Sequence, residues 1–449
     1  MRYDKYSPQL SPYSGGSRRR RRRVAGCLRT FIMVMMVMII AVSFVLFWQL
    51  FLEKRIQPVS SYFTKKTAAT TFEPTINTVT PVPTPLPEIE ELLPFSETVE
   101  SFFGPLPTPE FRSDLKRKEV RAIYAGTADK LDSNIALAEN SEINALIIDL
   151  KESYGIPFNS QNPLATSIGD VAPEYNLSSV IEKCHAKDVW VIGRIVCFKD
   201  PGLASAHPEL SIQDEEGNAL RFSLEGGLKF ANPYSPDVWD YYIDLAIEAI
   251  EMGVDEIQFD YVRFPTGNTQ SGNTPYYGPE ETTPKKSEAI NRFLQTARIR
   301  IQDTYGVPVS ADVFAIVLTN GIDREILGQD WPTIGLTGID SVCPMIYHDL
   351  YVRGFILNNK VYESPDLYPY DITYNALVVG KQNAPAEGFS VIRPYLKAYT
   401  ASWLGNGRYL NYGHEEINAQ IRALEDAGYS EFVLWNANNE YPEGTYQGN

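Results

Sequence analysis

The sequence predicts an α/β protein that folds as a (β/α)8 TIM barrel with long strand-to-helix loops, and three observations support this fold. Apolar segments of strand length alternate with amphipathic helical segments from residue 119 to residue 449. The strand-to-helix connections are long, at 199–235, 265–281 and 348–366, whereas the helix-to-strand connections are short. The body of about 330 residues lies within the size range of this fold, which builds its sites from long loops on one face.

The eight predicted strands are apolar runs rich in β-branched residues, at 120–124, 144–150, 189–197, 256–261, 307–313, 339–346, 390–395 and 431–435. The best-marked helix is predicted over Pro236–Met252. Ser235 is a suitable N-cap, and proline is favoured at the first helical position. Gly253 ends the pattern, and the fourth strand follows three residues later.

An open, doubly wound sheet is the alternative architecture for alternating strands and helices. Such a sheet is expected to carry a glycine-rich turn such as GxGxxG after its first strand. Residues 124–129 read YAGTAD and do not supply one. The closed barrel is therefore the favoured fold.

The N-terminal region predicts a membrane anchor. Residues 1–55 contain eleven Lys or Arg against two acidic residues, including the run from Arg18 to Arg23. Residues 31–52 are apolar apart from Ser43 and Gln49, and a helix of this length spans about 33 Å, enough for a bilayer core of about 30 Å. The positive-inside rule then places residues 1–30 in the cytoplasm and the chain after residue 52 outside the cell.

A cleaved signal peptide is the alternative for this region. Its apolar part would be only about 7–15 residues long and would precede a small-residue cleavage site. Here the run is longer and is followed by QLFLEKRIQP. The sequence therefore favours an uncleaved signal anchor, which predicts a single-pass protein of the cell membrane.

Residues 53–117 are predicted to be an extracytoplasmic Pro/Thr-rich stalk. Prolines at 81, 83, 85 and 87 favour extended, polyproline-like chain. No helical or strand period persists in this region, so the barrel domain is predicted to cover 118–449. After residue 55 the chain has 29 basic and 54 acidic residues, which argues against nucleic acid as a partner and leaves neutral or cationic partners open. The sequence predicts no particular protein partner.

Cysteine and histidine are scarce, with four of each in the chain. No CxxC pair occurs, which argues against a zinc finger or an iron–sulfur cluster. No metal or organic cofactor is predicted. Three cysteines follow the predicted anchor, Cys184, Cys197 and Cys343, and at least one of an odd number must be unpaired within the chain.

Two carboxylates are predicted at the C-terminal ends of neighbouring strands. Alternate residues of a barrel strand point inward, so Glu256, Gln258 and Asp260 share the inward face of strand four. Ser310 and Asp312 share that face of strand five. Adjacent strands lie about 4.8 Å apart. The carboxyls of Asp260 and Asp312 are therefore expected near the separation of about 5–5.5 Å found in retaining glycosidases.

Other strand ends carry polar and aromatic residues that suit a sugar ligand, because sugar hydroxyls need planar hydrogen-bonding groups and sugar CH faces pack on rings. The predicted substrate-binding residues are Asp149, Glu152, Arg263, Tyr347, His348, Arg393, Tyr395, Trp435 and Asn436.

Each candidate also has a structural explanation. Asp260 can form a buried ion pair with Arg263, and Asp312 can cap the loop that follows it. Asp149 and Glu152 can hold a loop in place. The aromatic side chains can be ordinary packing at the top of a barrel, and the histidine can be a structural hydrogen-bonding group.

Several segments resemble a bacterial family of glycosyl-hydrolase domains that was first catalogued as a domain of unknown function. The matching runs are RAIYAGTA (121–128), INALIIDLKESYG (143–155), VDEIQFDYVRFP (254–265), SADVF (310–314), CPMIYH (343–348) and FVLWNANN (432–439). The resemblance covers about residues 119–445 and implies a TIM barrel related to retaining sugar hydrolases. It implies the nucleophile at Asp260 and the acid/base at Asp312, where the α-amylase-like relatives usually carry Glu.

The resulting hypothesis is a membrane-anchored extracytoplasmic glycoside hydrolase acting on a cell-surface or environmental polysaccharide or oligosaccharide. Asp260 is predicted to attack the anomeric carbon, Asp312 to act as acid and then base, and Arg263 to keep Asp260 ionised. One alternative is a non-catalytic carbohydrate-binding or wall-associated barrel. Another is a different hydrolase or lyase that uses Asp149 and Glu152.

Overall fold

The computed structural model describes residues 93–109, 113–385, 387–444 and 446. The predicted cytoplasmic segment, the predicted anchor at 31–52 and most of the predicted stalk therefore lie outside the described residues. Within these described ranges, no helix is both long and apolar enough to cross a bilayer.

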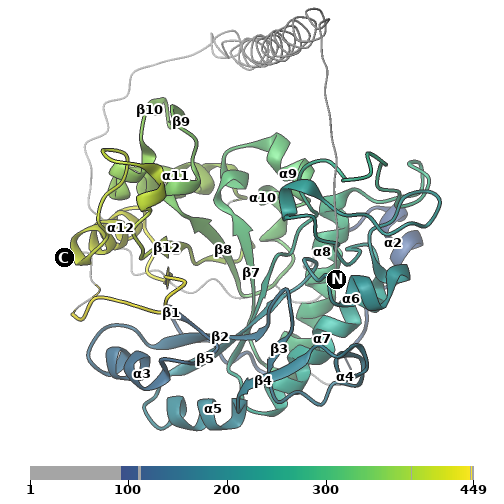
Figure 1. Ribbon diagram of the computed structural model, residues 1–449, viewed down its shortest axis with the longest axis horizontal. Coiled ribbons are helices and arrows are strands. Elements are labelled where there is room, and N and C mark those ends of the chain that lie inside the picture. The colour runs from purple at the N-terminus through teal and green to yellow at the C-terminus, as the bar shows by residue number, and fades with distance from the viewer. Residues whose placement is uncertain (1–92, 110–112, 386, 445, 447–449) are drawn as a thin grey trace, which may run out of the picture. The chain divides into compact units, whose positions relative to one another are not determined.

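Eight parallel strands form a closed barrel (Figure 1). In order around the barrel they are β1 (Arg121–Gly126), β2 (Ala145–Lys151), β5 (Trp190–Val196), β6 (Glu256–Asp260), β7 (Val309–Phe314), β8 (Ser341–Ile346), the pair β11 (Val391–Ile392) and β12 (Tyr395–Lys397), and β13 (Phe432–Trp435). Pairing of β1 with β13 closes the ring, with Ala122 beside Val433. This closure confirms the barrel, and an open sheet would leave both of these strands as unpaired edges.

Helices alternate with the strands and cover the outside of the barrel. They are α3 (Leu131–Glu139), α4 (Pro163–Ile168), α5 (Leu177–His185), α6 (Leu203–Ala206), α7 (Pro236–Glu251), α8 (Lys286–Ala297), α9 (Gly321–Leu327), α10 (Trp331–Ile334), α11 (Pro369–Asn383) and α12 (His414–Asp426). A π-helical stretch, η5 (Arg298–Asp303), continues α8. Helix α7 begins at Pro236, as the sequence predicted, and ends at Glu251, one residue before the predicted end.

The long loops on the C-terminal face contain the remaining elements. The short strands are β3 (Ile156–Phe158), β4 (Val171–Tyr175), β9 (Phe355–Leu357) and β10 (Lys360–Tyr362). The 3₁₀ turns are η3 (Pro208–Leu210), η4 (Ser223–Glu225), η6 (Ala315–Leu318), η7 (His348–Leu350), η8 (Pro365–Leu367) and η9 (Ser402–Leu404).

The protein has two apolar cores, one outside and one inside the barrel. The larger packs the helices on the outer face of the sheet. The smaller fills the barrel and includes Ala122, Ile147, Ile192 and Val433 from strands β1, β2, β5 and β13. The inward positions of β6 and β7 are polar instead, with Glu256, Gln258, Asp260, Ser310 and Asp312 all buried.

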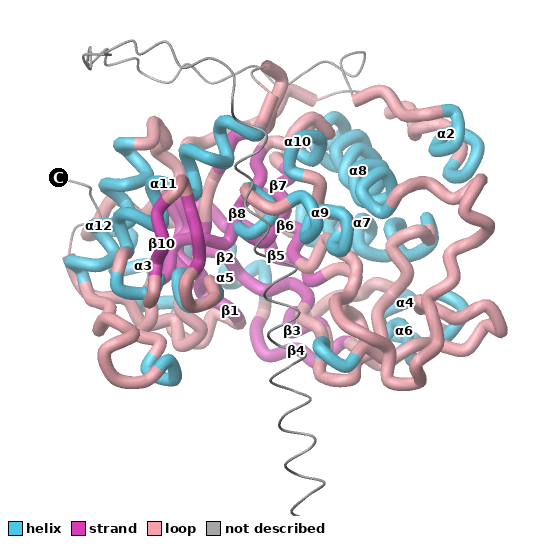
Figure 2. The backbone as a smooth tube through the Cα atoms, turned by 90° about the horizontal axis from the view of Figure 1, so that it is seen from above, coloured by secondary structure: helices cyan, strands magenta, loops and turns pink. Residues whose placement is uncertain are grey.

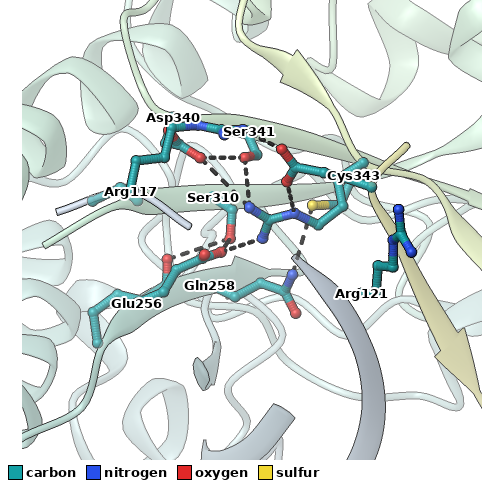
Figure 3. Close-up of polar contacts among 12 residues, drawn as sticks. Arg117, Arg121, Glu256, Gln258, Ser310, Asp340, Ser341 and Cys343 are labelled. Atoms are coloured by element: carbon teal, nitrogen blue, oxygen red, sulfur yellow. Dashed lines mark hydrogen bonds and ion pairs between the residues drawn. The ribbon is translucent and has the colours of Figure 1, made fainter. Parts of the chain in front are cut away.

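A network of buried charges closes the N-terminal end of the barrel (Figure 3). The guanidinium of Arg393 donates to Glu256 at 2.6 Å and to Glu431 at 2.9 Å. Arg117 donates to Asp340 at 2.8 Å and also contacts Glu431. Buried ions need partners in a medium of low dielectric constant, and these five residues pair with one another, although Oε2 of Glu256 has no hydrogen-bond partner among the described residues.

The end of the predicted stalk packs on the barrel. Residues Glu97–Phe103 form helix α2, although the sequence predicted no regular element there. Figures 1 and 2 both place α2 beside α8. Val99 is fully buried, the ring of Phe103 lies 4.8 Å from that of Trp239, and Arg292 of α8 pairs with Glu100 at 3.2 Å. This short segment therefore belongs structurally to the barrel domain.

Candidate active site

A cavity of about 990 Å³ opens at the C-terminal ends of the strands. Strands β6, β7 and β5 contribute Asp260, Asp312 and Arg194 to its lining, and loops contribute the charged residues Arg263, Asp349 and Glu440. Its aromatic lining is Tyr261, Phe314, Tyr347, Tyr395, Tyr399, Trp403, Tyr412, Trp435 and Tyr441. Its location matches the face on which barrels of this type carry their active sites, and its mixture of rings and a few charges suits a sugar.

Asp260 is the last residue of β6, and its carboxylate is held by three hydrogen bonds. Arg194 donates to its Oδ2 through Nε at 3.0 Å and through a terminal nitrogen at 2.5 Å. The backbone N–H of Tyr261 donates to its Oδ1 at 2.6 Å. Hydrogen bonds from a guanidinium and a backbone amide are charge-assisted and directional, so they fix the position of this carboxylate.

Arg194 also bonds to Asp149, and the sequence analysis missed this arginine. Its third nitrogen donates to Asp149 Oδ1 at 2.5 Å, and Tyr124 donates to the other oxygen of the same carboxylate. Asp149 is fully buried and does not line the cavity, so it serves to orient Arg194. The available clue was that Arg194 is the one charged residue of the strand Trp190–Val196.

Asp312, on β7, is 1% exposed and lines the cavity. Burial raises the pKa of its carboxyl well above the usual range, and the negative charge of Asp260 raises it further. Its Oδ1 has no hydrogen-bond partner among the described residues. The raised pKa favours the protonated form of this carboxyl, and its unpartnered oxygen is open to a ligand.

The two carboxyls therefore have different surroundings although they occupy neighbouring strands. Phe259 and Ala311 are partners in the β6–β7 ladder, so Asp260 and Asp312 are the next residues on each strand. Neighbouring strands are about 4.8 Å apart. A charged carboxylate beside a neutral carboxyl is the combination that glycosidic bond cleavage requires.

Tyr261 follows Asp260 in an unusual backbone conformation. Its φ of 53° lies in the left-handed region that favours glycine. Two cations contact its ring, with the Arg263 guanidinium at 5.0 Å and the Lys199 amine at 4.9 Å from its centroid. Strain of this kind persists where the surroundings fix the backbone, often next to an active site, and here it orients the amide that bonds to Asp260.

The same turn explains why the predicted role of Arg263 was wrong. The positive φ of Tyr261 interrupts the inward–outward alternation, and the Arg263 guanidinium pairs with Glu225 at 2.8 and 3.1 Å instead of Asp260. Burial would raise the pKa of Glu225, but its bonds to Arg263 and Thr266 outweigh burial and lower the pKa to about 2. Arg263 still lines the cavity as a paired cation.

The structure places Tyr347, Tyr395, Trp435 and Asn436 in the cavity lining. Tyr395 also donates to the amide oxygen of Gln258 at 2.5 Å. These four residues thus occupy positions compatible with their predicted contact with substrate.

Four predicted substrate-binding residues lie outside the cavity lining, and Asp149, described above, is one of them. Arg393 is 0% exposed in the N-terminal charge network, at the opposite end of the barrel. His348 is buried between Tyr412 and Thr373, and burial followed by the charge of Lys397 lowers its pKa to about 3. Glu152 lies in an exposed turn, where its backbone bonds to Gly155 at 2.9 Å. The Glu152 side chain is hydrogen-bonded to Asp149, but Asp149 is fully buried and neither residue lines the cavity.

Among the described residues, no group of three or more His, Cys, Asp or Glu is arranged to hold a metal ion. The cysteines Cys184, Cys197 and Cys343 are buried and free. Burial raises the pKa of the Cys197 and Cys343 thiols well above the usual range, so neither has the thiolate character of a nucleophile.

A closed barrel with two carboxyls in different surroundings, both lining an aromatic cavity at the C-terminal ends of the strands, is typical of the glycosidase class. The sequence pattern described as "Putative glycosyl hydrolase domain" matches residues 120–441, and the chain belongs to that family. No curated protein sequence matches the chain.

Solved structures that resemble the chain include three bacterial proteins. A hypothetical protein from Ruminiclostridium thermocellum is 36% identical over 43% of this chain and 97% of its own, with a TM-score of 0.38. The spore cortex-lytic enzyme SleL of Bacillus cereus is 14% identical over 73% of each chain, with a TM-score of 0.42. The glycoside hydrolase domain of PgaB (BpsB) from Bordetella bronchiseptica is 11% identical over 71% of this chain and 94% of its own, with a TM-score of 0.49.

Proposed function

We propose that the protein is a retaining glycoside hydrolase in which Asp260 is the nucleophile and Asp312 the acid/base. The observation that carries this proposal is that two neighbouring carboxyls, those of Asp260 and Asp312, lie in opposite electrostatic environments. Asp260 accepts charge-assisted bonds from Arg194, whereas burial raises the pKa of Asp312 well above its usual range.

The chemistry follows from these two environments. The Asp260 carboxylate attacks the anomeric carbon, while the Asp312 carboxyl protonates the glycosidic oxygen as the bond to the leaving sugar breaks. The resulting Asp312 carboxylate then removes a proton from water, which attacks the glycosyl–Asp260 ester and releases a sugar of retained configuration. Arg194 takes part as a positioning residue that fixes the Oδ2 atom of Asp260.

The proposed setting is the outer surface of a bacterial cell, with the barrel anchored through residues 31–52 and acting on a cell-surface or environmental polysaccharide. The basic run at 18–23 followed by the apolar run supports this orientation. The aromatic lining of the cavity supports a carbohydrate substrate.

The mechanism is tested with Asp260→Ala and Asp312→Ala in the full chain. The substrates are aryl glycosides and bacterial surface polysaccharides that the parent protein cleaves. Asp260→Ala is expected to abolish turnover, and added azide is expected to restore part of it as a glycosyl azide of inverted configuration. Asp312→Ala is expected to lower turnover by about 10²–10⁴-fold. Turnover of aryl glycosides should fall less, because their leaving groups need less protonation.

Asp132→Ala provides the matched control, because the Asp132 side chain is 85% exposed and lies outside the cavity lining. Normal turnover by Asp260→Ala would show that Asp260 is structural. Glycan binding without hydrolysis by the parent chain would favour the non-catalytic alternative instead.

A further inference from the structure

An aromatic ledge extends the cavity beyond the two carboxyls. We use this name for Tyr399, Trp403 and Leu350, which line the same cavity but come from loops after β12 and β8. The Tyr399 and Trp403 rings are stacked, with centroids 5.9 Å apart and planes 19° apart. Trp403 is nonetheless 66% exposed and Leu350 62% exposed.

The ledge is continuous with the candidate catalytic centre through aromatic contacts. The Tyr399 ring meets the Trp435 ring at 5.2 Å, and the Trp435 ring meets the Tyr347 ring at 5.3 Å. Tyr347 lines the same cavity as Asp312. A row of rings therefore leads from Asp312 to the outermost residue, Trp403.

The base of the ledge is held rigidly before any ligand arrives. The Tyr399 hydroxyl donates to Asp349 Oδ1 at 2.7 Å. The same carboxylate oxygen lies 3.4 Å from the amine of Lys397, which is fully buried. Lys397 also lies 4.8 Å from the Tyr399 ring centroid, as a cation under the ring face. An ordered ring offers a preformed stacking surface at little entropic cost on binding.

Large apolar side chains are usually buried, since covering one contributes about 1.5–3 kcal/mol. Trp403 remains largely uncovered although it lines a cavity that contains the candidate catalytic residues. We infer that the ledge is a binding subsite for a further sugar ring of the same glycan whose scissile bond lies at Asp260 and Asp312. This inference rests on the proposed function and specifies its substrate as a chain rather than a single glycoside.

The charges and size of the cavity define the glycan further. Its two arginines are paired with carboxylates, Arg194 with Asp260 and Arg263 with Glu225. Asp349 at the ledge is already paired with Lys397, so the ledge suits an uncharged sugar. The volume of about 990 Å³ lies at the upper end of the range for pockets that bury drug-sized ligands, about 300–1,000 Å³. One pyranose ring is much smaller than such a ligand and would leave much of this space empty.

The test measures binding in the full chain with the catalytically silenced background Asp260→Asn. Neutral malto-, cello-, xylo- and chito-oligosaccharides of two to six units are titrated, and binding is followed by calorimetry and tryptophan fluorescence. The affinity for one series is expected to rise with chain length. Trp403→Ala is expected to weaken the longest member by about tenfold, as expected for one lost stacking contact of about 1.4 kcal/mol, and to leave the disaccharide unchanged.

Trp403→Phe is expected to retain most of the affinity because it keeps a flat ring. Tyr154→Ala is the matched control, since Tyr154 is 73% exposed and lies outside the cavity lining. Equal weakening of short and long ligands by Trp403→Ala would overturn the subsite, and so would the absence of binding by all four series. Length-dependent binding that persists while Asp260→Ala retains turnover would instead refute the mechanism and leave the subsite standing.

Discussion

Arg194 bridges Asp149 and Asp260. One terminal nitrogen of its guanidinium lies 2.5 Å from Asp149 Oδ1, and the other lies 2.5 Å from Asp260 Oδ2. These three residues stand on the neighbouring strands β2, β5 and β6. The bridge fixes the position of Asp260, the proposed nucleophile, because Arg194 is itself held by Asp149. Four predictions follow from this bridge and from other features of the structure.

Arg194→Lys should lower turnover by about ten- to a hundredfold while KM changes little. Lysine retains the charge but cannot bond both carboxylates in the planar geometry of a guanidinium, and one charge-assisted bond contributes about 1.5–3 kcal/mol. Steady-state kinetics would measure the effect. Arg300→Lys is the control, because Arg300 bridges Asp240 and Asp244 on the surface in the same way. An equal loss in both variants would contradict the positioning role.

Asp312→Asn should make the protein more stable relative to the parent as pH rises. A carboxyl whose pKa is raised by burial contributes full stability below its unfolded pKa of about 3.9, and this contribution is lost as pH rises through the raised folded value. Asparagine does not ionise and should escape this loss. Urea unfolding at several pH values measures the difference, and a gap that shrinks with rising pH would contradict a buried neutral Asp312.

The pH dependence of catalysis should follow the same group. Asp312 must be protonated to donate to the leaving oxygen, so kcat/KM should fall as pH rises through its raised pKa. Asp312→Ala should lack this alkaline limb on aryl glycosides that need no acid. Retention of the limb in that variant would assign it to another residue.

Val99→Ala should lower the melting temperature by several degrees. Val99 of α2 is fully buried, and the change removes apolar volume that costs about 2 kcal/mol. Calorimetry of the full chain measures the shift. Glu97→Ala, at an exposed position of the same helix, should melt as the parent does. The sequence analysis placed these residues in a stalk outside the barrel domain at 118–449, and an unchanged Val99→Ala variant would support that boundary.

The strands could be predicted from sequence because each is an apolar run with clear ends. All eight predicted strands overlap strands of the barrel. The inward parity of Asp260 and Asp312 followed from the period of two, and both line the cavity. Which end of a strand a residue occupies was harder to predict. Arg393 was placed near the end of a strand at 390–395, but the seventh strand continues to Lys397, so Arg393 lies toward the N-terminal end.

Long-range pairing was not predictable from local pattern. The partner of Asp260 is Arg194, 66 positions away, whereas the sequence analysis chose the nearby Arg263. The packing of α2 on α8 also depends on a contact across 192 positions, between Glu100 and Arg292. Neither the Pro/Thr composition nor a hydrophobic period contains information about such contacts.

The charge network around Arg393 determines how substrate, water and products reach and leave the cavity. Arg393 and Glu256 are fully buried at the N-terminal end of the barrel, and apolar side chains that include Ala122, Ile147 and Ile192 fill the interior above them. A glycan, the water that completes its cleavage and both product halves must therefore pass through the mouth on the opposite face. Under the proposed mechanism, the departing half has to leave the acceptor position before water can occupy it. The rate of that departure sets whether the glycosyl–enzyme ester is hydrolysed or passed to a second sugar.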